Sequence, residues 1–374
     1  MAVGAETRAP PKKKTLAPPG PMIAPRLWND RQARRQAAGF NRTASAKPSH
    51  HRTSTMPIVA DSTYQPPRFL ANGHLQTVFP PLLRRVKGVV YRRERIKTPD
   101  DDFLDLDWSV CGSRRVAVIA HGLEGNSQRS YALGMVKALS KNGWDAVVWN
   151  ARGCSGEPNH SLRFTHSGAT EDLHAVLAHI FSTREYPEIA LMGFSLGGNL
   201  TLKYVGERAT TLDPRIKKAV AFSVPCDLQS SSVQFSKPAN RIYMRHFLVA
   251  LHEKIRAKMK THPGQIDDRG YERLRNFKDF DDRYTAPLHG FKDAEDYWAR
   301  CSCKSFLKNI RIPTLLINAR NDPFLAEACF PVVASAANPN LHLEMPASGG
   351  HVGFITFNGQ GEYWSESRAV SFLS

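Results

Sequence analysis

Short apolar runs of strand length alternate with helical stretches through most of this 374-residue chain. This alternation limits the possible folds more than any other feature. The expected strands cover residues 115–120, 145–150, 189–193, 218–224, 312–317 and 340–345. The expected helices between them cover residues 130–142, 170–183 and 198–210. Because the strands are apolar along nearly their whole length, both faces of their sheet must be buried. The pattern therefore predicts an α/β fold with a mostly parallel central sheet and helices on both faces.

Residues 229–301 interrupt this alternation. They are basic, rich in helical patterns and without a good strand. One amphipathic helix is predicted there from apolar side chains spaced four residues apart, namely Tyr243, Phe247, Leu251, Ile255 and Met259. We expect this segment to form a helical cap over the sheet, with contact to a membrane surface as the alternative.

Basic side chains accompany the predicted cap helix, at Arg241, Arg245, Lys254 and Arg256. We interpret them as a solvated face, because runs of charge on a helix usually face water. Recognition of a phosphate or carboxylate head group is the alternative.

The N-terminal residues 1–60 differ from the rest in composition. They are rich in Pro, Ala, Arg and Lys and contribute +9 of the net charge of +17. We expect a disordered basic tail, and a folded domain over residues 61–374. A start codon assigned too early, with Met56 as the true start, and a mitochondrial transit peptide are the alternatives. The expected location is therefore cytoplasmic, or mitochondrial if the tail is a transit peptide and the source is eukaryotic.

The composition argues against several classes of protein. No apolar stretch has the length of a membrane-spanning helix, so no integral membrane segment is expected. No recognisable nucleic-acid-binding module occurs, so no nucleic-acid partner is expected, although binding through the basic tail is an alternative. The six cysteines are scattered and lack the spacing of a disulfide framework or a zinc site. We expect free thiols, no metal and no cofactor.

The strongest motif is G-x-S-x-G at residues 193–197, between an expected strand and an expected helix. In this context the motif forms a sharp turn that lifts a serine hydroxyl clear of the sheet. The glycines are needed because larger side chains would collide with neighbouring backbone. The turn also places Ser195 at a helix N-terminus, where free N–H groups favour negative charge. Ser195 is therefore the predicted nucleophile.

A serine nucleophile needs a base and an acid that orients the base. Position selects His351 from the 14 histidines, because it follows the last expected strand between glycines, in G-G-H-V-G. Asp322 follows the strand at residues 312–317 and is the predicted acid. Asp227 also follows a strand and is the rival acid. The chain order Ser195, Asp322, His351 is typical of this arrangement of strands.

Residues 121–125 (H-G-L-E-G) follow another expected strand and predict the second half of an oxyanion hole. We assign the hole to the backbone N–H groups of Leu123 and Leu196. Three further residues are predicted to line the substrate pocket: His121, Gly122 and Phe194. His74 and His166 lie in turns, where we expect them to fix loops or to line the pocket.

Eight motifs together resemble one known family. They occupy residues 72–77, 121–125, 152–158, 166–168, 170–173, 193–199, 321–324 and 350–354. The chain resembles, over residues 64–357, the α/β-hydrolase subfamily that contains bacterial hydrolases of unassigned substrate, fungal medium-chain ester synthase/esterases and animal phospholipase-like proteins. The resemblance implies an α/β-hydrolase fold, no cofactor, and Ser195, Asp322 and His351 as nucleophile, acid and base. The chain ends at Ser374, soon after the His351 loop, so we expect a departure from the family's usual terminal helix.

These features predict a serine hydrolase that cleaves carboxylic esters, such as short- or medium-chain acyl esters or lipids, through an acyl-enzyme on Ser195. Two alternatives remain: an acyltransferase that makes esters from alcohols, and a non-catalytic binding protein with the same fold. The expected partner is a small-molecule or lipid ester.

Overall fold

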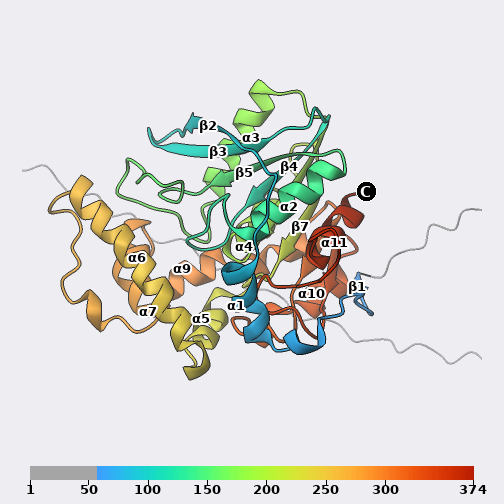
Figure 1. Ribbon diagram of the computed structural model, residues 1–374. Coiled ribbons are helices and arrows are strands. Elements are labelled where there is room, and N and C mark those ends of the chain that lie inside the picture. Colours follow the sequence, from blue (N-terminus) through green and yellow to red (C-terminus); the bar gives the residue numbers. More distant parts are fainter. Residues whose placement is uncertain (1–56) are drawn as a thin grey trace, which may run out of the picture. The chain divides into compact units, whose positions relative to one another are not determined.

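The computed structural model describes residues 57–374, which form a nine-stranded sheet flanked by helices (Figure 1). The strands are β1 (Ile58–Val59), β2 (Arg92–Lys97), β3 (Phe103–Ser109), β4 (Arg115–Ala120), β5 (Asp145–Asn150), β6 (Glu188–Phe194), β7 (Ile216–Phe222), β8 (Thr314–Ile317) and β9 (Leu341–Glu344). The six strands expected from the apolar runs are all present, with ends that differ by a few residues.

The strand order is β1-β9-β8-β7-β6-β4-β5-β3-β2. All neighbours run parallel except β3, which is antiparallel to both β5 and β2. The mostly parallel α/β-hydrolase architecture is therefore confirmed. Its parallel strands end together at one edge, where such sheets usually place their functional sites.

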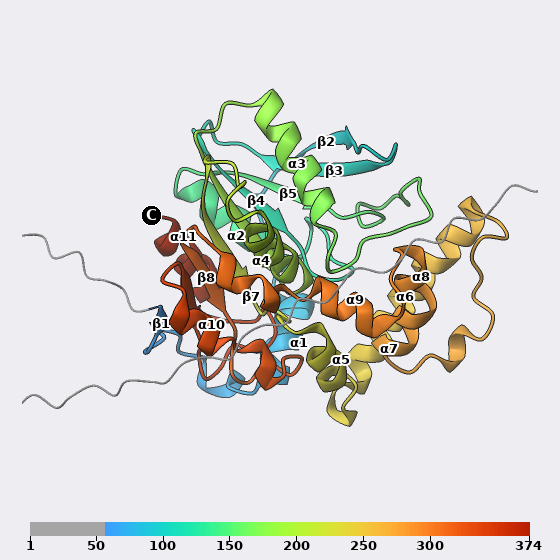
Figure 2. The same ribbon diagram turned by 180° about the vertical axis from the view of Figure 1, so that it is seen from behind.

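Helices cover both faces of the sheet. The main helices are α1 (Gly73–Leu83), α2 (Ser130–Lys141), α3 (Thr170–Thr183), α4 (Leu196–Arg208), α10 (Val332–Ala337) and α11 (Trp364–Leu373). Helices α2 and α11 lie on one face and α3 and α4 on the other, as Figures 1 and 2 show from opposite sides. The three predicted helices correspond to α2, α3 and α4.

The continuous apolar runs arise because successive side chains enter two different cores. In β4, Val116 and Val118 pack into the core under α3 and α4, whereas Ala117 and Ile119 pack into the core under α2 and α11. All four side chains are buried. A strand with two buried faces loses the alternation of polar and apolar residues that marks a half-exposed strand.

Strands β2 and β3 were not predicted, because β3 alternates apolar residues with aspartates. Asp105 and Asp107 are buried but form bidentate pairs with Arg95 and Arg93 of β2, at N···O distances of 2.8–2.9 Å. Each pair lies directly across the antiparallel ladder. The charge that makes β3 look like a surface strand is thus neutralised by its neighbour.

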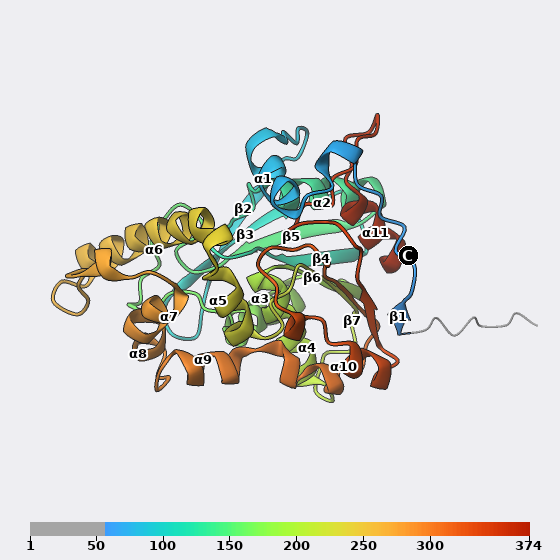
Figure 3. The same ribbon diagram turned by 90° about the horizontal axis from the view of Figure 1, so that it is seen from below.

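The segment from residue 228 to 301, the cap, contains helices and no strand in the structure. Its helices are α5 (Leu228–Phe235), α6 (Arg241–Thr261), α7 (Phe277–Phe280), α8 (Ala286–Leu288) and α9 (Ala294–Cys301), with a π-helical turn at Asp281–Thr285. Figure 3 shows these helices grouped beside the sheet. The predicted amphipathic helix is α6, which buries Leu251 and Ile255.

One of the four basic residues in this region does not belong to a solvated face. Lys254 is buried, and its ammonium group lies 2.6 Å from Glu124 Oε1. The expectation of a wholly solvated basic face is wrong for this residue, because it points from α6 towards the sheet domain. Arg241, Arg245 and Arg256 are exposed as expected.

Both ends of the folded region differ from expectation. Strand β1 lies at residues 58 and 59, before the expected boundary at 61, because its residues pair in parallel with Leu343 and Glu344 of β9.

The chain also ends in a helix, α11, against our expectation. A capping box and an ion pair between Arg84 and Glu366 of 2.6 Å stabilise its first turn. The predicted disordered tail falls on residues outside those described, apart from its last four.

The described helices include none that is both long and apolar enough to cross a membrane. All six cysteines lie within the described residues and are free thiols, of which only Cys111 is exposed.

Candidate active site

Ser195 occupies a strained turn between β6 and α4. Its backbone angles are φ 54° and ψ −118°, a conformation that residues other than glycine rarely adopt. The peptide is held there by a hydrogen bond from Ser195 N–H to the carbonyl oxygen of Phe222, at 2.8 Å. This hydrogen bond to the neighbouring strand β7 therefore fixes the conformation of the turn.

The flanking glycines allow two backbone segments to approach each other closely. A Cβ on Gly193 would collide with the carbonyl oxygen of Gly197, and a Cβ on Gly197 would collide with the carbonyl oxygen of Ala120. Both obstacles are backbone atoms that cannot swing away. The two glycines of the motif are thus a steric requirement of the turn.

His351 lies in the loop after β9, and both of its ring nitrogens have partners. Nε2 is 2.8 Å from Ser195 Oγ, and Nδ1 is 2.8 Å from Asp322 Oδ2. The three side chains follow β6, β8 and β9, which end at the same edge of the sheet. The structure brings together the three residues that the sequence singled out.

Helix α1 supports the His351 loop. Thr77 Oγ1 accepts a hydrogen bond from the His351 backbone N–H at 2.9 Å and donates one to the carbonyl oxygen of Gly73. A Cβ on Gly350 would come within 2.5 Å of that same carbonyl oxygen. The motif at residues 72–77 therefore positions the histidine loop, a role that the sequence alone did not reveal.

The two candidate acids have different surroundings. Asp322 is buried, and its Oδ1 accepts a hydrogen bond from Phe324 N–H at 2.9 Å while Oδ2 faces His351. Asp227 caps α5 by accepting from Ser230 N–H at 3.0 Å and pairs with Lys304 at 3.1 Å. Asp227 has no contact with His351, so its environment is that of a helix cap.

Leu123 and Leu196 line the same pocket as Ser195 and His351. Leu196 is the first residue of α4, so its N–H is one of the groups that a helix leaves without an internal partner. Neither N–H has an acceptor among the described residues. The two groups are therefore free to bind an oxyanion.

The three residues predicted to line the substrate pocket do not do so. His121 is buried, with Nδ1 2.8 Å from the carbonyl oxygen of Gly122 and Nε2 accepting from Ala151 N–H at 3.0 Å. Burial lowers its pKa to about 4, so the ring is neutral, with its proton on Nδ1. A Cβ on Gly122 would lie 3.3 Å from Ser195 Cβ, and Phe194 stacks on Phe222 in the core. Phe194 is the last residue of β6, His121 and Gly122 directly follow β4, and all three are buried, which explains the misprediction.

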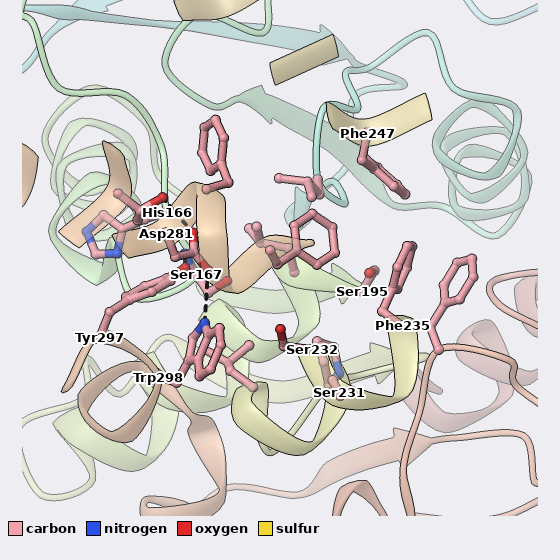
Figure 4. A pocket seen from close by; sticks show the side chains of 18 of the residues that line it. His166, Ser167, Ser195, Ser231, Ser232, Phe235, Phe247, Asp281, Tyr297 and Trp298 are labelled. Atoms are coloured by element: carbon pink, nitrogen blue, oxygen red, sulfur yellow. Dashed lines mark hydrogen bonds between the residues drawn. The ribbon is translucent and has the colours of Figure 1, made fainter. Parts of the chain in front are cut away.

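The pocket above Ser195 is formed largely by the cap. Its cavity volume is about 130 Å³. Figure 4 shows Phe235 and Phe247 close to Ser195, with Asp281, Tyr297 and Trp298 further along the pocket. Phe247 and Leu251 of the predicted amphipathic helix line the pocket, in line with the sequence-based expectation of an acyl pocket at this helix. The sequence did not single out Phe235, Tyr297 or Trp298. His166 lines the pocket, as expected, whereas His74 contacts Tyr243 of α6 at 3.2 Å.

A largely buried ion pair connects the cap to the loop that carries Leu123. Lys254 of α6 contacts Glu124, which directly follows Leu123 in the chain. The backbone of Glu124 has a positive φ of 50°. The side chains of Lys254 and Glu124 are only 7% and 15% exposed. The position of Leu123 is thus linked to the docking of α6.

Within residues 57–374, no three His, Cys, Asp or Glu side chains are grouped in a way that could hold a metal ion. The site brings together a serine hydroxyl, an imidazole, a carboxylate and two free N–H groups.

Comparison with known proteins agrees with this architecture. Residues 117–357 match the family described as "alpha/beta hydrolase fold". This chain belongs to the alpha/beta hydrolase family. Within this family, the chain is 36% identical over 322 residues to "Putative esterase YheT" of Escherichia coli, covering 84% of this chain and 94% of that protein.

Other relatives in the family have lipase names. Phospholipase ABHD3 of Mus musculus is 30% identical, with 80% of this chain and 74% of that protein covered. A monoacylglycerol lipase of Saccharomyces cerevisiae is 27% identical, with 76% and 64% covered. Among solved structures, the Pyrococcus furiosus esterase Pf2001 has a TM-score of 0.52 at 17% identity, over 78% of this chain and 94% of that one, which supports the fold alone. The relatives' names support ester hydrolysis as the general type of activity.

Proposed function

We propose that this protein is a serine hydrolase that cleaves carboxylic esters through an acyl-enzyme on Ser195. The observation that supports this proposal is the continuous hydrogen-bonded chain from Ser195 Oγ to His351 and on to Asp322, with both distances at 2.8 Å. These distances are short enough for direct proton transfer between hydroxyl and imidazole.

In the proposed reaction, His351 Nε2 takes the proton of Ser195 as its oxygen attacks the ester carbonyl. Asp322 accepts the hydrogen bond of His351 Nδ1–H, which keeps the lone pair on Nε2 and stabilises the imidazolium. The N–H groups of Leu123 and Leu196 bind the oxyanion, and each such donor contributes roughly 3–4 kcal/mol in comparable enzymes. His351 then protonates the leaving alcohol, and water releases the acid from Ser195.

The substrate class follows from the pocket and from the relatives. Phe235, Phe247, Phe277 and Phe324 give the part of the pocket near Ser195 an apolar surface. Such a surface suits an acyl chain, in line with the names phospholipase and monoacylglycerol lipase among the relatives. We propose lipid-like esters of short or medium acyl length. Contact of the cap with a membrane surface stays a prediction.

The test is to compare the purified protein with its Ser195→Ala variant on p-nitrophenyl esters of increasing chain length. We expect turnover to fall by about 10⁶-fold in the variant, because the nucleophile is lost. A fluorophosphonate probe should label the unchanged protein and not the variant. Equal turnover by both proteins contradicts the nucleophile assignment, and an unlabelled Ser195 favours a non-catalytic binding protein.

Release by an alcohol instead of water would make the same acyl-enzyme an acyltransferase. Adding ethanol to the ester assay separates these routes, because transfer produces an ethyl ester in place of the free acid.

A further inference from the structure

One side of the Ser195 pocket is polar, although an acyl chain needs only an apolar surface. In Figure 4, His166, Ser167, Asp281 and Tyr297 gather on one side of the pocket, and Ser195, Phe235 and Phe247 on the other. We call Thr165, His166, Ser167, Asp281 and Tyr297 the polar wall. All five side chains line the pocket and are almost fully buried.

Asp281 is the carboxyl group of this wall. Its Oδ1 accepts from Thr285 Oγ1 at 2.6 Å, and its Oδ2 accepts from Trp298 Nε1 at 2.9 Å. Each carboxylate oxygen can accept a further hydrogen bond, and no Lys, Arg or His among the described residues forms an ion pair with Asp281. Burial raises the pKa of Asp281 to about 7. The pocket thus contains a carboxyl group with spare acceptor capacity.

Thr165 supplies an unpaired hydroxyl to the same wall. Its Oγ1 is buried and has no hydrogen-bond partner among the described residues. Buried polar groups are paired in the great majority of cases, so an orphan that lines a pocket points to a ligand or a bound water as the missing partner. The neighbouring His166 adds no charge, because burial and the nearby His289 lower its pKa well below the usual value.

We propose that the polar wall binds an aliphatic hydroxyl group of the substrate, so that the protein selects esters that carry a hydroxyl away from the scissile bond. A hydroxyl can donate one hydrogen bond and accept another, so the carboxyl of Asp281 and the unpaired hydroxyl of Thr165 are each suited to bind one. An unsubstituted alkyl chain would leave Thr165 Oγ1 buried without a partner and would not use the remaining acceptor sites of Asp281. The inference rests on the proposed ester hydrolysis at Ser195 and names its substrate class.

The hydroxyl can belong to the acyl chain or to the alcohol part of the ester, and two matched pairs distinguish them. The first pair is p-nitrophenyl octanoate and its hydroxyoctanoate analogue. The second is propyl octanoate and 1-octanoylglycerol, which differ in the hydroxyls of the leaving alcohol. We expect kcat/KM to favour the hydroxylated member of one pair by about tenfold or more, since a site built around a hydroxyl discriminates strongly against its absence.

Two variants test the residues. We expect Asp281→Asn and Thr165→Val each to reduce the preference ratio, hydroxylated over plain, by about tenfold. Asparagine replaces one acceptor oxygen with an NH2 donor, and valine lacks the hydroxyl. Asp282→Asn is the matched control, since Asp282 is the adjacent carboxylate but pairs with Lys278 outside the pocket lining. A merely structural role of Asp281, through Thr285 and Trp298, would slow both members of a pair equally and leave the ratio unchanged.

The inference is overturned if neither pair shows a preference for the hydroxylated ester, or if the ratio stays the same in both variants. If Asp281→Asn does not fold, Thr165→Val still tests the hydroxyl subsite, because the hydroxyl that it removes makes no hydrogen bond within the described residues. Full turnover by Ser195→Ala would refute the proposed function itself. Turnover that depends on Ser195 but shows no preference refutes only the hydroxyl subsite.

Discussion

The sheet domain and the cap place their functional groups by different means. At the sheet edge, Ser195 and His351 are held by backbone: a positive φ, glycines without room for a Cβ, and hydrogen bonds to neighbouring peptides. In the cap, Asp281 and Lys254 are held by side-chain pairing after burial. We therefore expect the proposed reacting groups to tolerate little change of backbone, and the proposed substrate selection to depend on buried polar pairs.

The largest effect on kcat is expected at the sheet edge, among the groups held by backbone. Asp322→Asn should lower kcat by about 10⁴-fold without unfolding the protein, because the amide no longer holds His351 in the tautomer that accepts the serine proton. Steady-state kinetics on a p-nitrophenyl ester measures the effect. Asp227→Asn is the control and should leave kcat within about twofold, since asparagine also caps a helix. Equal losses in the two variants would show that Asp227 shares the role of acid.

An intermediate effect is expected where the two regions meet. Lys254→Met leaves Glu124 partly buried without its cation, and breaking such a pair lowers the free energy of unfolding by about 3 kcal/mol. We also expect kcat to fall by about tenfold, because Glu124 adjoins Leu123 of the proposed oxyanion hole. Denaturant unfolding and ester kinetics measure the two effects.

Lys260→Met changes an exposed lysine of the same helix and serves as the control. If Lys254→Met loses stability but keeps its full kcat, the ion pair docks the cap without positioning the oxyanion hole.

The smallest expected effect concerns the cap alone and depends on pH. Because burial raises the pKa of Asp281 to about 7, the folded state keeps this proton up to about pH 7, whereas the unfolded chain loses it near pH 4. The contribution of Asp281 to stability therefore falls as the pH rises from about 4 to about 7. The Tm of Asp281→Asn minus that of the unchanged protein should increase between pH 5 and pH 8. A difference that stays constant over this range would mean that Asp281 titrates normally.

The catalytic candidates were predictable because each depends on local sequence. The motif at residues 193–197 specifies a sharp turn through its glycines, and His351 and Asp322 follow recognisable apolar strands. The lining of the pocket was not predictable in the same way. His121 and Phe194 were expected there on account of their closeness in sequence to reactive positions, yet both pack into the interior.

The outer parts of the fold illustrate the same limit. Strand β3 was not predicted because Asp105 and Asp107 interrupt its apolar pattern. Their burial is explained only by Arg95 and Arg93, which lie opposite them across the ladder. Helix α11 is stabilised at its start by Arg84, which is distant in sequence. Pairings of this kind join residues that no local pattern connects.

The sequence by itself determined the alternating α/β architecture, the strained turn at Ser195 and the chain order of the three reactive side chains. These follow from steric limits on the backbone and from apolar periodicity, which act over a few residues. Only the tertiary structure decided which acid faces His351, that Lys254 reaches Glu124, and that Asp281 and Thr165 share a pocket with Ser195. Such outcomes depend on desolvation and charge pairing between distant segments, which exist only after the chain has folded.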